Sequence, residues 1–180
     1  MENQATSTQK ESGMITGLFN DKESSESAYK ALRDRGYSDH DINVIMSDDT
    51  RKKYYANDAD SELGTKATEG SGVGGLVGGT LGAIIAGVAA IGTNLVLPGL
   101  GLVVWGPLAA ALAGAGAGGL TGGLVGALIG WGIPEDRAKI YEEGVKNGGT
   151  VLGVQPRSAE DAASLKTDWE TNHRGQNIYN

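Results

Sequence analysis

The first charged part of the chain alternates apolar and polar positions in a way that predicts a strand, a helix and a second strand. Residues 14–19 and 42–46 are short apolar runs typical of strands. The residues between them carry apolar positions at helical spacing, with Asn20 as the expected N-cap and Gly36 as the residue that ends the helix. This pattern predicts a strand–helix–strand unit.

The second charged part predicts a helix, a strand and a final helix. Pro134 suits the first position of a helix, where a missing N–H costs nothing. Residues 150–154 are the expected third strand, and Ser158 with Asp161 resembles a capping box that opens the last helix. Residues 173–180 are polar and are interpreted as a tail.

Neither part can bury its own apolar face, so the two are expected to join into one small sheet of about three strands covered by helices. The predicted fold class is α+β: a small ferredoxin-like (βαβ…αβα) domain interrupted by a glycine-zippered hydrophobic helical hairpin. The expected divisions are a disordered tail at 1–12, the first half of the domain at 13–50, a polar linker at 51–69, the apolar helical hairpin at 70–133, the second half of the domain at 134–172, and the tail at 173–180.

The interrupting block is defined by its lack of charge. Residues 70–134 contain no Asp, Glu, Lys, Arg or His, and these 65 residues hold 21 of the 30 glycines. Two stretches, 73–97 and 107–131, each number 25 residues. As helices they would reach about 37 Å, against a bilayer core of roughly 30 Å. Both are therefore candidates for membrane spans.

Glycine spacing within this block predicts close helix–helix packing. A glycine at every fourth position gives a helix one smooth stripe along which another backbone can approach closely. The predicted glycine zipper consists of Gly74, Gly78 and Gly82 in the first stretch and of Gly114, Gly118, Gly122, Gly126 and Gly130 in the second.

Two environments could hold such a helix together, and a third reading treats the segment as disordered or aggregating. Glycine costs about 1 kcal/mol per residue in a water-exposed helix. A bilayer would enforce the helix by leaving no water for unpaired amides. Dense packing against protein would do the same, and would give a soluble oligomer with a buried glycine-rich interior.

Flanking charges set the topology if the hairpin inserts. Nine Lys and Arg residues precede the block and six follow it, so the positive-inside rule puts both termini in the cytoplasm, at a bacterial inner membrane. The alternative location is the cytoplasm itself. Trp105 and Trp131 are the expected interfacial aromatics. Arg51, Lys52 and Lys53 are candidate contacts for anionic headgroups, against the alternative of a solvated charge run.

Composition argues against several other kinds of partner. The net charge of −7 disfavours nucleic acid, and the absence of cysteine excludes thiolate chemistry. His40 is expected in a turn and His173 in the tail, both exposed to solvent. We predict no catalytic constellation, no metal site and no cofactor. A G-x-G-x-x-G match at 70–75 follows a polar linker instead of a strand, so nucleotide binding is not expected.

Several segments resemble a known bacterial family. Residues 14–19, the helix ending in 35–38, and residues 41–45 are similar to the N-terminal motif of the general stress proteins (17M-like, heat-induced). The glycine-rich block, followed by 132–135 and 148–154, looks like the long form of that family. The resemblance implies a stress-induced bacterial protein without an established enzymatic activity, and it supplies no catalytic residues.

These observations lead to three functional hypotheses. The first is a non-enzymatic stress-response protein whose glycine-zipper hairpin inserts into the bilayer and self-associates, while the α/β domain stays in the cytoplasm. The second is a soluble oligomeric assembly whose apolar hairpins bury one another. The third is a module that senses a small ligand of unknown identity, as small plait domains often do.

Overall fold

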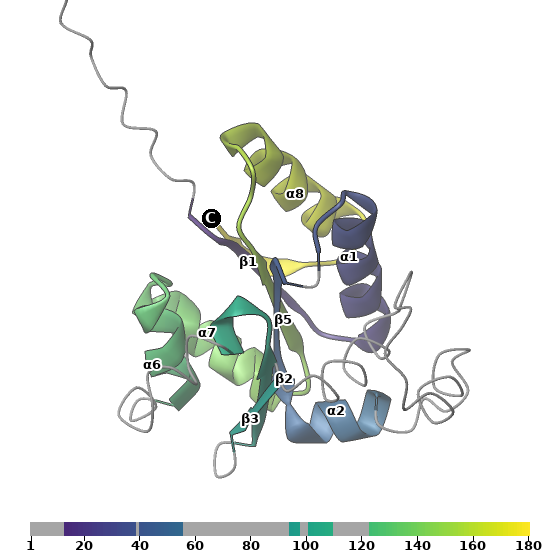
Figure 1. Cartoon of the computed structure of the whole chain (residues 1–180). Coiled ribbons are helices and arrows are strands. Elements are labelled where there is room, and N and C mark those ends of the chain that lie inside the picture. Colours follow the sequence, from purple (N-terminus) through teal and green to yellow (C-terminus); the bar gives the residue numbers. More distant parts are fainter. Residues whose placement is uncertain (1–12, 39, 56–93, 98–100, 110–122) are drawn as a thin grey trace, which may run out of the picture.

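Six strands form one sheet in the order β3-β4-β2-β5-β1-β6, and every neighbouring pair is antiparallel (Figure 1). This computed structural model describes residues 13–38, 40–55, 94–97, 101–109 and 123–180. The strands are β1 Ile15–Phe19, β2 Ile42–Ser47, β3 Asn94–Leu97, β4 Leu102–Trp105, β5 Thr150–Val154 and β6 Gln176–Tyr179. The helices are α1 Lys22–Asp34, α2 Asp48–Tyr54, α6 Gly123–Gly130, α7 Glu135–Lys146 and α8 Ala159–Thr171.

The two charged parts of the chain interleave to make the centre of the sheet. Helix α1 connects β1 to β2, and β5 from the second part lies between these two strands. Helix α8 connects β5 to β6, and β1 lies between them. The three predicted strands are therefore confirmed as β1, β2 and β5. The expectation of about three strands in all was wrong, because β3, β4 and β6 extend the sheet on both sides.

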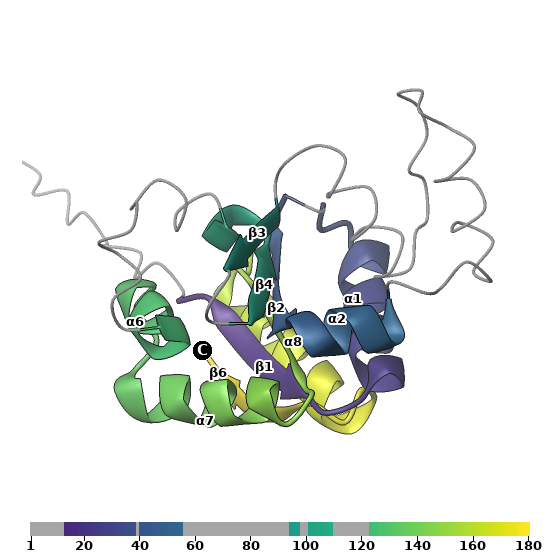
Figure 2. The same ribbon diagram turned by 90° about the horizontal axis from the view of Figure 1, so that it is seen from below.

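Two apolar clusters lie on opposite faces of the sheet because successive side chains of a strand point to opposite sides. Ile15, Val44 and Leu152 face α1 and α8. Leu18 and Ile45, the alternate positions, belong to the second cluster, which α6 and α7 cover (Figure 2). Both faces are thus buried, which explains why β1, β4 and β5 are buried at every position.

Part of the uncharged block is a β-hairpin and not a helical one. Strands β3 and β4 pair in a regular antiparallel register, from Asn94 opposite Trp105 to Leu97 opposite Leu102. Strand β4 also pairs with β2, so the hairpin widens the sheet. Residues 94–97 therefore do not belong to a first helical span. The remainder of that span, residues 73–93, lies outside the described residues.

The second predicted span is described only at its two ends, which pack on the same domain. Leu108 and Ala109, at its start, and Leu124 and Leu128, in α6, all belong to the cluster on the α7 face of the sheet. Both ends of residues 107–131 are thus packed on the same domain. Residues 110–122 lie outside the described residues.

The segments predicted as a polar linker and a polar tail both contain regular elements. Helix α2 occupies part of the expected polar linker because Ser47 caps it by accepting from the Thr50 N–H, with acidic residues in its first turn and basic ones in its last. The expected tail contains β6, which pairs with β1. The rest of the linker, residues 56–69, lies outside the described residues.

Helix ends follow their predicted chemistry with two corrections. Pro134 is the N-cap of α7, which begins at Glu135, and not the first residue of the helix. Asp21, and not Asn20, caps α1, because its carboxylate accepts from the Ser24 N–H at 2.8 Å. Gly36 ends the helix as predicted, with φ of +83°. Ser158 caps α8 as predicted, accepting from the Asp161 N–H at 3.1 Å.

Candidate functional site

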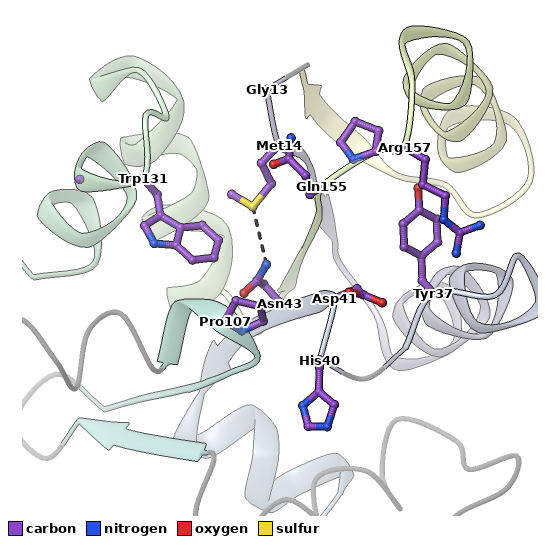
Figure 3. A pocket seen from close by; sticks show the side chains of 12 residues that line it. Gly13, Met14, Tyr37, His40, Asp41, Asn43, Pro107, Trp131, Gln155 and Arg157 are labelled. Atoms are coloured by element: carbon purple, nitrogen blue, oxygen red, sulfur yellow. Dashed lines mark hydrogen bonds between the residues drawn. The ribbon is translucent and has the colours of Figure 1, made fainter. Parts of the chain in front are cut away.

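A cleft of about 800 Å³ opens at one end of the sheet, where segments from across the chain converge (Figure 3). These segments are the start of β1, the turn before β2, the end of β4, the end of α6 and the stretch that follows β5. The volume is in the range of small-molecule sites. The lining residues are Gly13, Met14, Tyr37, His40, Asp41, Asn43, Pro107, Gly130, Trp131, Gln155, Pro156 and Arg157.

Asn43 fixes the floor of the cleft. Its Oδ1 accepts from the Leu108 N–H at 2.8 Å, and its Nδ2 donates to the Gly153 carbonyl at 3.3 Å. The side chain is only 5% exposed, so these bonds satisfy an amide that would otherwise be costly to bury. Asn43 thereby joins β2 and β5 to the chain that leaves β4.

Tyr37 and Arg157 form a stacked wall. The Arg157 guanidinium lies 4.3 Å from the centre of the Tyr37 ring and donates to the carbonyls of Arg35 and Gly36 at 3.0 and 2.7 Å. The Tyr37 hydroxyl donates to Asp161. Burial, followed by this hydrogen bond to a carboxylate, raises the pKa of Tyr37 to about 12. The phenol is therefore neutral at physiological pH. Its hydrogen bond to Asp161 and its contact with Arg157 hold it in place.

Asp41 brings a carboxylate to the cleft. Its Oδ2 accepts from the Ser38 hydroxyl at 2.6 Å and from the Ser38 N–H at 2.8 Å. These two bonds hold the pKa of the Asp41 carboxyl below its usual range, with a smaller contribution from the positive charge of Arg157. The carboxylate is therefore ionised at neutral pH, and the side chain is exposed.

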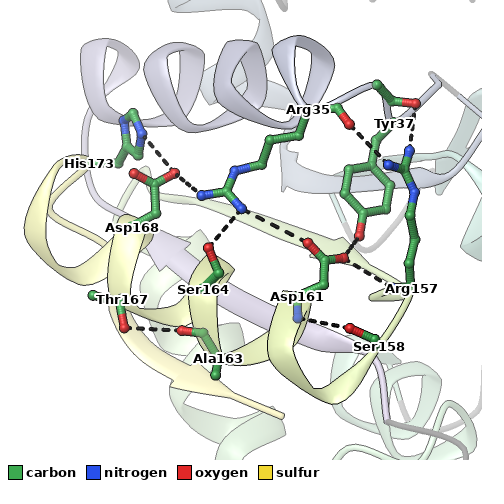
Figure 4. A network of polar contacts seen from close by, with 11 residues as sticks. Arg35, Tyr37, Arg157, Ser158, Asp161, Ala163, Ser164, Thr167, Asp168 and His173 are labelled. Atoms are coloured by element: carbon green, nitrogen blue, oxygen red, sulfur yellow. Dashed lines mark hydrogen bonds and ion pairs between the residues drawn. The ribbon is translucent and has the colours of Figure 1, made fainter.

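A polar network beside the cleft ties α1 to α8 (Figure 4). Arg35 at the end of α1 reaches Asp168 at 3.3 Å and Asp161 at 3.9 Å. His173, which follows α8, lies 3.6 Å from Asp168 through Nε2. Its Nδ1 lies 2.7 Å from the Ser27 hydroxyl. The expected position of His173 in a solvated tail was wrong, because β6 returns this segment to the domain.

Ser27, His173 and Asp168 have the residue types of a catalytic triad, an arrangement that the sequence alone did not predict. Their geometry differs from that of a triad. The distance from His173 to Asp168 exceeds a hydrogen bond, and Asp168 is already held by Arg35 and by Asn172. Ser27 does not line the cleft. These residues instead form polar contacts that connect α1 with α8 and the segment that follows it.

Two positions of the predicted glycine zipper, Gly126 and Gly130, lie among the described residues. A Cβ built on Gly126 or Gly130 would meet nothing within 4 Å, so the described part of the chain does not pack tightly against either glycine. Close packing at these positions would need another molecule or another segment. Gly74, Gly78, Gly82, Gly114, Gly118 and Gly122 lie outside the described residues.

The two tryptophans expected at a membrane interface have different environments. Trp105 is 2% exposed and belongs to the cluster under α1 and α8, because β4 is a strand of the sheet. The expected interfacial position of Trp105 is therefore wrong for this fold. Trp131 is half-buried against the opposite cluster and lines the cleft.

The basic residues of α2 are largely engaged within the helix. Asp48 contacts Arg51 at 2.7 Å and Lys52 at 2.6 Å. The Lys53 ammonium lies 4.7 Å from the centre of the Tyr54 ring. The helix packs on the α1 face of the sheet, whereas Trp131 packs on the opposite face. A flat membrane surface would therefore not contact Trp131 and the basic residues of α2 at the same time.

Among the residues that the structure describes, no three metal-ligating side chains gather into a group that could hold a metal ion. Within the same part of the chain, none of the helices combines the length and the apolar character needed to cross a membrane.

Sequence reasoning missed Asn43, Tyr37 and Arg157 as site residues. Comparison with family models, curated proteins and solved structures finds no match for this chain.

Proposed function

We propose that this chain is a non-enzymatic, self-associating protein of the bacterial stress response. In this proposal its core is a ferredoxin-like plait, and its uncharged segment makes the contact between copies. The strand order β6-β1-β5-β2, with α1 and α8 as the two crossover helices on one face, supports the plait. The stress-response part rests on the resemblance of residues 14–19, 35–38 and 41–45 to the general stress proteins.

The observation that carries self-association is the edge of the sheet formed by β3. This strand is Asn-Leu-Val-Leu and lies within a stretch that has no charged residue from 70 to 134. Among the described residues it pairs with β4 alone. An apolar edge strand without charges is a template for pairing with another chain.

The other edge of the sheet has the features that prevent such pairing. Strand β6 is polar at Gln176 and Asn177, and Asn177 has a positive φ of 50°. Its register with β1 shifts between Thr16 and Leu18, which is a bulge or irregularity. Polar residues and bulges protect edge strands from pairing. The contrast favours β3 as the edge that meets a second copy.

Helix α6 adds uncharged surface of the same kind. Its eight residues contain no charge, Ile129 is 43% exposed, and no described residue lies within 4 Å of a Cβ built on Gly126 or Gly130. Small residues permit close approach of a second helix. Insertion of the uncharged segment into a bilayer is the competing function. It is less favoured, because both ends of residues 107–131 pack on the same domain and the basic helix α2 lies on the opposite face.

Light scattering coupled to size-exclusion chromatography, without detergent, tests the proposal. We expect the full chain to be an oligomer, Asn94→Lys to shift it towards smaller species, and Gln176→Lys to leave it unchanged. Both substitutions replace an amide with a charge at the first residue of an edge strand, so they form a matched pair. A monomeric native chain, or equal behaviour of the two variants, would contradict it. Retention in membranes after alkaline carbonate extraction would establish the competing function.

A further inference from the structure

The cleft at the end of the sheet has two chemically different sides (Figure 3). Trp131, Met14 and Pro107 form an apolar side. Asp41, Tyr37 and Arg157 form a polar side that carries both signs of charge. A small-molecule site commonly combines apolar walls with a few polar groups that orient the ligand. This division therefore restricts the chemistry of a ligand that would fit.

The Asp41 carboxylate can accept a further hydrogen bond. Both Ser38 donors bind Oδ2. Among the described contacts, Oδ1 has no donor, although the ionised carboxylate is exposed at the cleft. A carboxylate in this state suits an ammonium group, which binds through a charge-assisted hydrogen bond.

The Arg157 guanidinium can donate further hydrogen bonds. It gives one N–H from each terminal nitrogen to the carbonyls of Arg35 and Gly36. A guanidinium carries more N–H groups than these two bonds use, and their fork matches a carboxylate. Stacking on Tyr37 holds the group in place, so little side-chain entropy would be lost when a ligand binds.

Asp41 and Arg157 line the same cleft, but in the described structure the Asp41 carboxylate binds Ser38 and the Arg157 guanidinium binds main-chain carbonyls. Arg157 is near enough for its charge to lower the pKa of the Asp41 carboxyl. Two opposite charges that share a cleft and are each held by other groups complement a ligand that carries both charges itself. A free α-amino acid is the simplest molecule that carries an ammonium and a carboxylate on the same carbon atom.

We propose that the cleft binds a free α-amino acid with an apolar or aromatic side chain. Its carboxylate binds Arg157, its ammonium binds Asp41, and its side chain packs against Trp131, Met14 and Pro107. The volume of about 800 Å³ accommodates such a molecule together with ordered water. This inference is independent of self-association, since it rests on the cleft alone.

Isothermal titration calorimetry of the full chain with three related compounds tests this recognition. L-Phenylalanine carries both charges, 2-phenylethylamine lacks the carboxylate, and 3-phenylpropionate lacks the ammonium. We expect phenylalanine to bind with a Kd of about 1 mM or tighter, and each analogue to bind at least about tenfold more weakly. Absence of binding by phenylalanine, or equal affinity for all three compounds, would overturn the proposal.

A charge-specific variant assigns the ammonium contact. Asp41→Asn keeps an oxygen acceptor for Ser38 and removes the negative charge, so it should weaken phenylalanine binding about tenfold while leaving phenylpropionate unaffected. Asp34→Asn is the matched control, because Asp34 is an exposed carboxylate paired with Lys30 and does not line the cleft. Equal losses in the two variants would contradict the assignment. The compound series with the native chain decides the question even if a variant fails to fold.

Discussion

At the scale of single residues, Asn43 links three parts of the chain that are far apart in sequence. Its amide contacts the Leu108 N–H and the Gly153 carbonyl, and it is almost fully buried. Asn43→Leu would leave both groups without this partner inside the domain. We expect a loss of about 1–3 kcal/mol in the free energy of unfolding, measured by urea denaturation. Asn147→Ala, at an exposed position after α7, is the control and should change stability little.

Tyr37 makes the stability of the domain depend on pH in the alkaline range. Its pKa is raised from 10.0 to about 12 by burial and by its bond to Asp161. The folded state therefore binds the phenolic proton more tightly than the unfolded state. This contribution to stability is fully present below pH 10.0 and is lost as the pH rises through about 12. Unfolding experiments across this range should show that decline in the native chain and a smaller one in Tyr37→Phe. Equal slopes would contradict the assignment.

At the scale of elements, glycines on two helices are expected to respond oppositely to the same change. A Cβ on Gly144 of α7 would meet the Leu18 side chain, so Gly144→Ala should cost about 1–3 kcal/mol through overpacking. A Cβ on Gly126 of α6 would meet no described residue within 4 Å, so Gly126→Ala should stabilise the fold by about 0.5–1 kcal/mol. Thermal denaturation of both variants measures the difference.

The same Gly126 variant tests the predicted glycine zipper. If the smooth face of α6 lies against another copy, an added methyl group separates the helices, and association should weaken although the fold becomes more stable. Sedimentation velocity reports the association separately from the thermal unfolding. Unchanged association would show that α6 is not part of the contact.

Elements with strong local signals were predictable from the sequence. Strand β5 has the predicted bounds, and Gly36 and Ser158 act as the expected helix signals. The β3–β4 hairpin was not predicted, because a short run that is apolar on both faces has no period that separates strand from helix. Strand β6 was missed for the opposite reason: its residues are polar, and only pairing with β1 orders them.

The candidate site was far less predictable than the elements around it. Its residues come from five separate segments, and nothing local marks Tyr37 or Arg157 as neighbours. The contact between Ser27 and His173 joins positions 146 residues apart, which no spacing rule would detect. Asp41 lies next to His40 in the turn before β2, and no local pattern marks it as a site residue. Its role depends on the distant stretch that follows β5.

At the scale of the whole molecule, the separation of charge from apolar sequence predicts how association responds to salt. All 37 charged residues lie outside residues 70–134, and the net charge is −7. Copies that meet through the uncharged segment form few ion pairs across the contact, while their like net charges repel. Raising NaCl to about 0.5 M screens that repulsion and leaves the apolar contact intact. We therefore expect sedimentation velocity to show stronger association at high salt than at low salt. An interface built on opposite charges, such as α2 against an acidic surface, would weaken instead, and that outcome would move the contact away from β3 and α6.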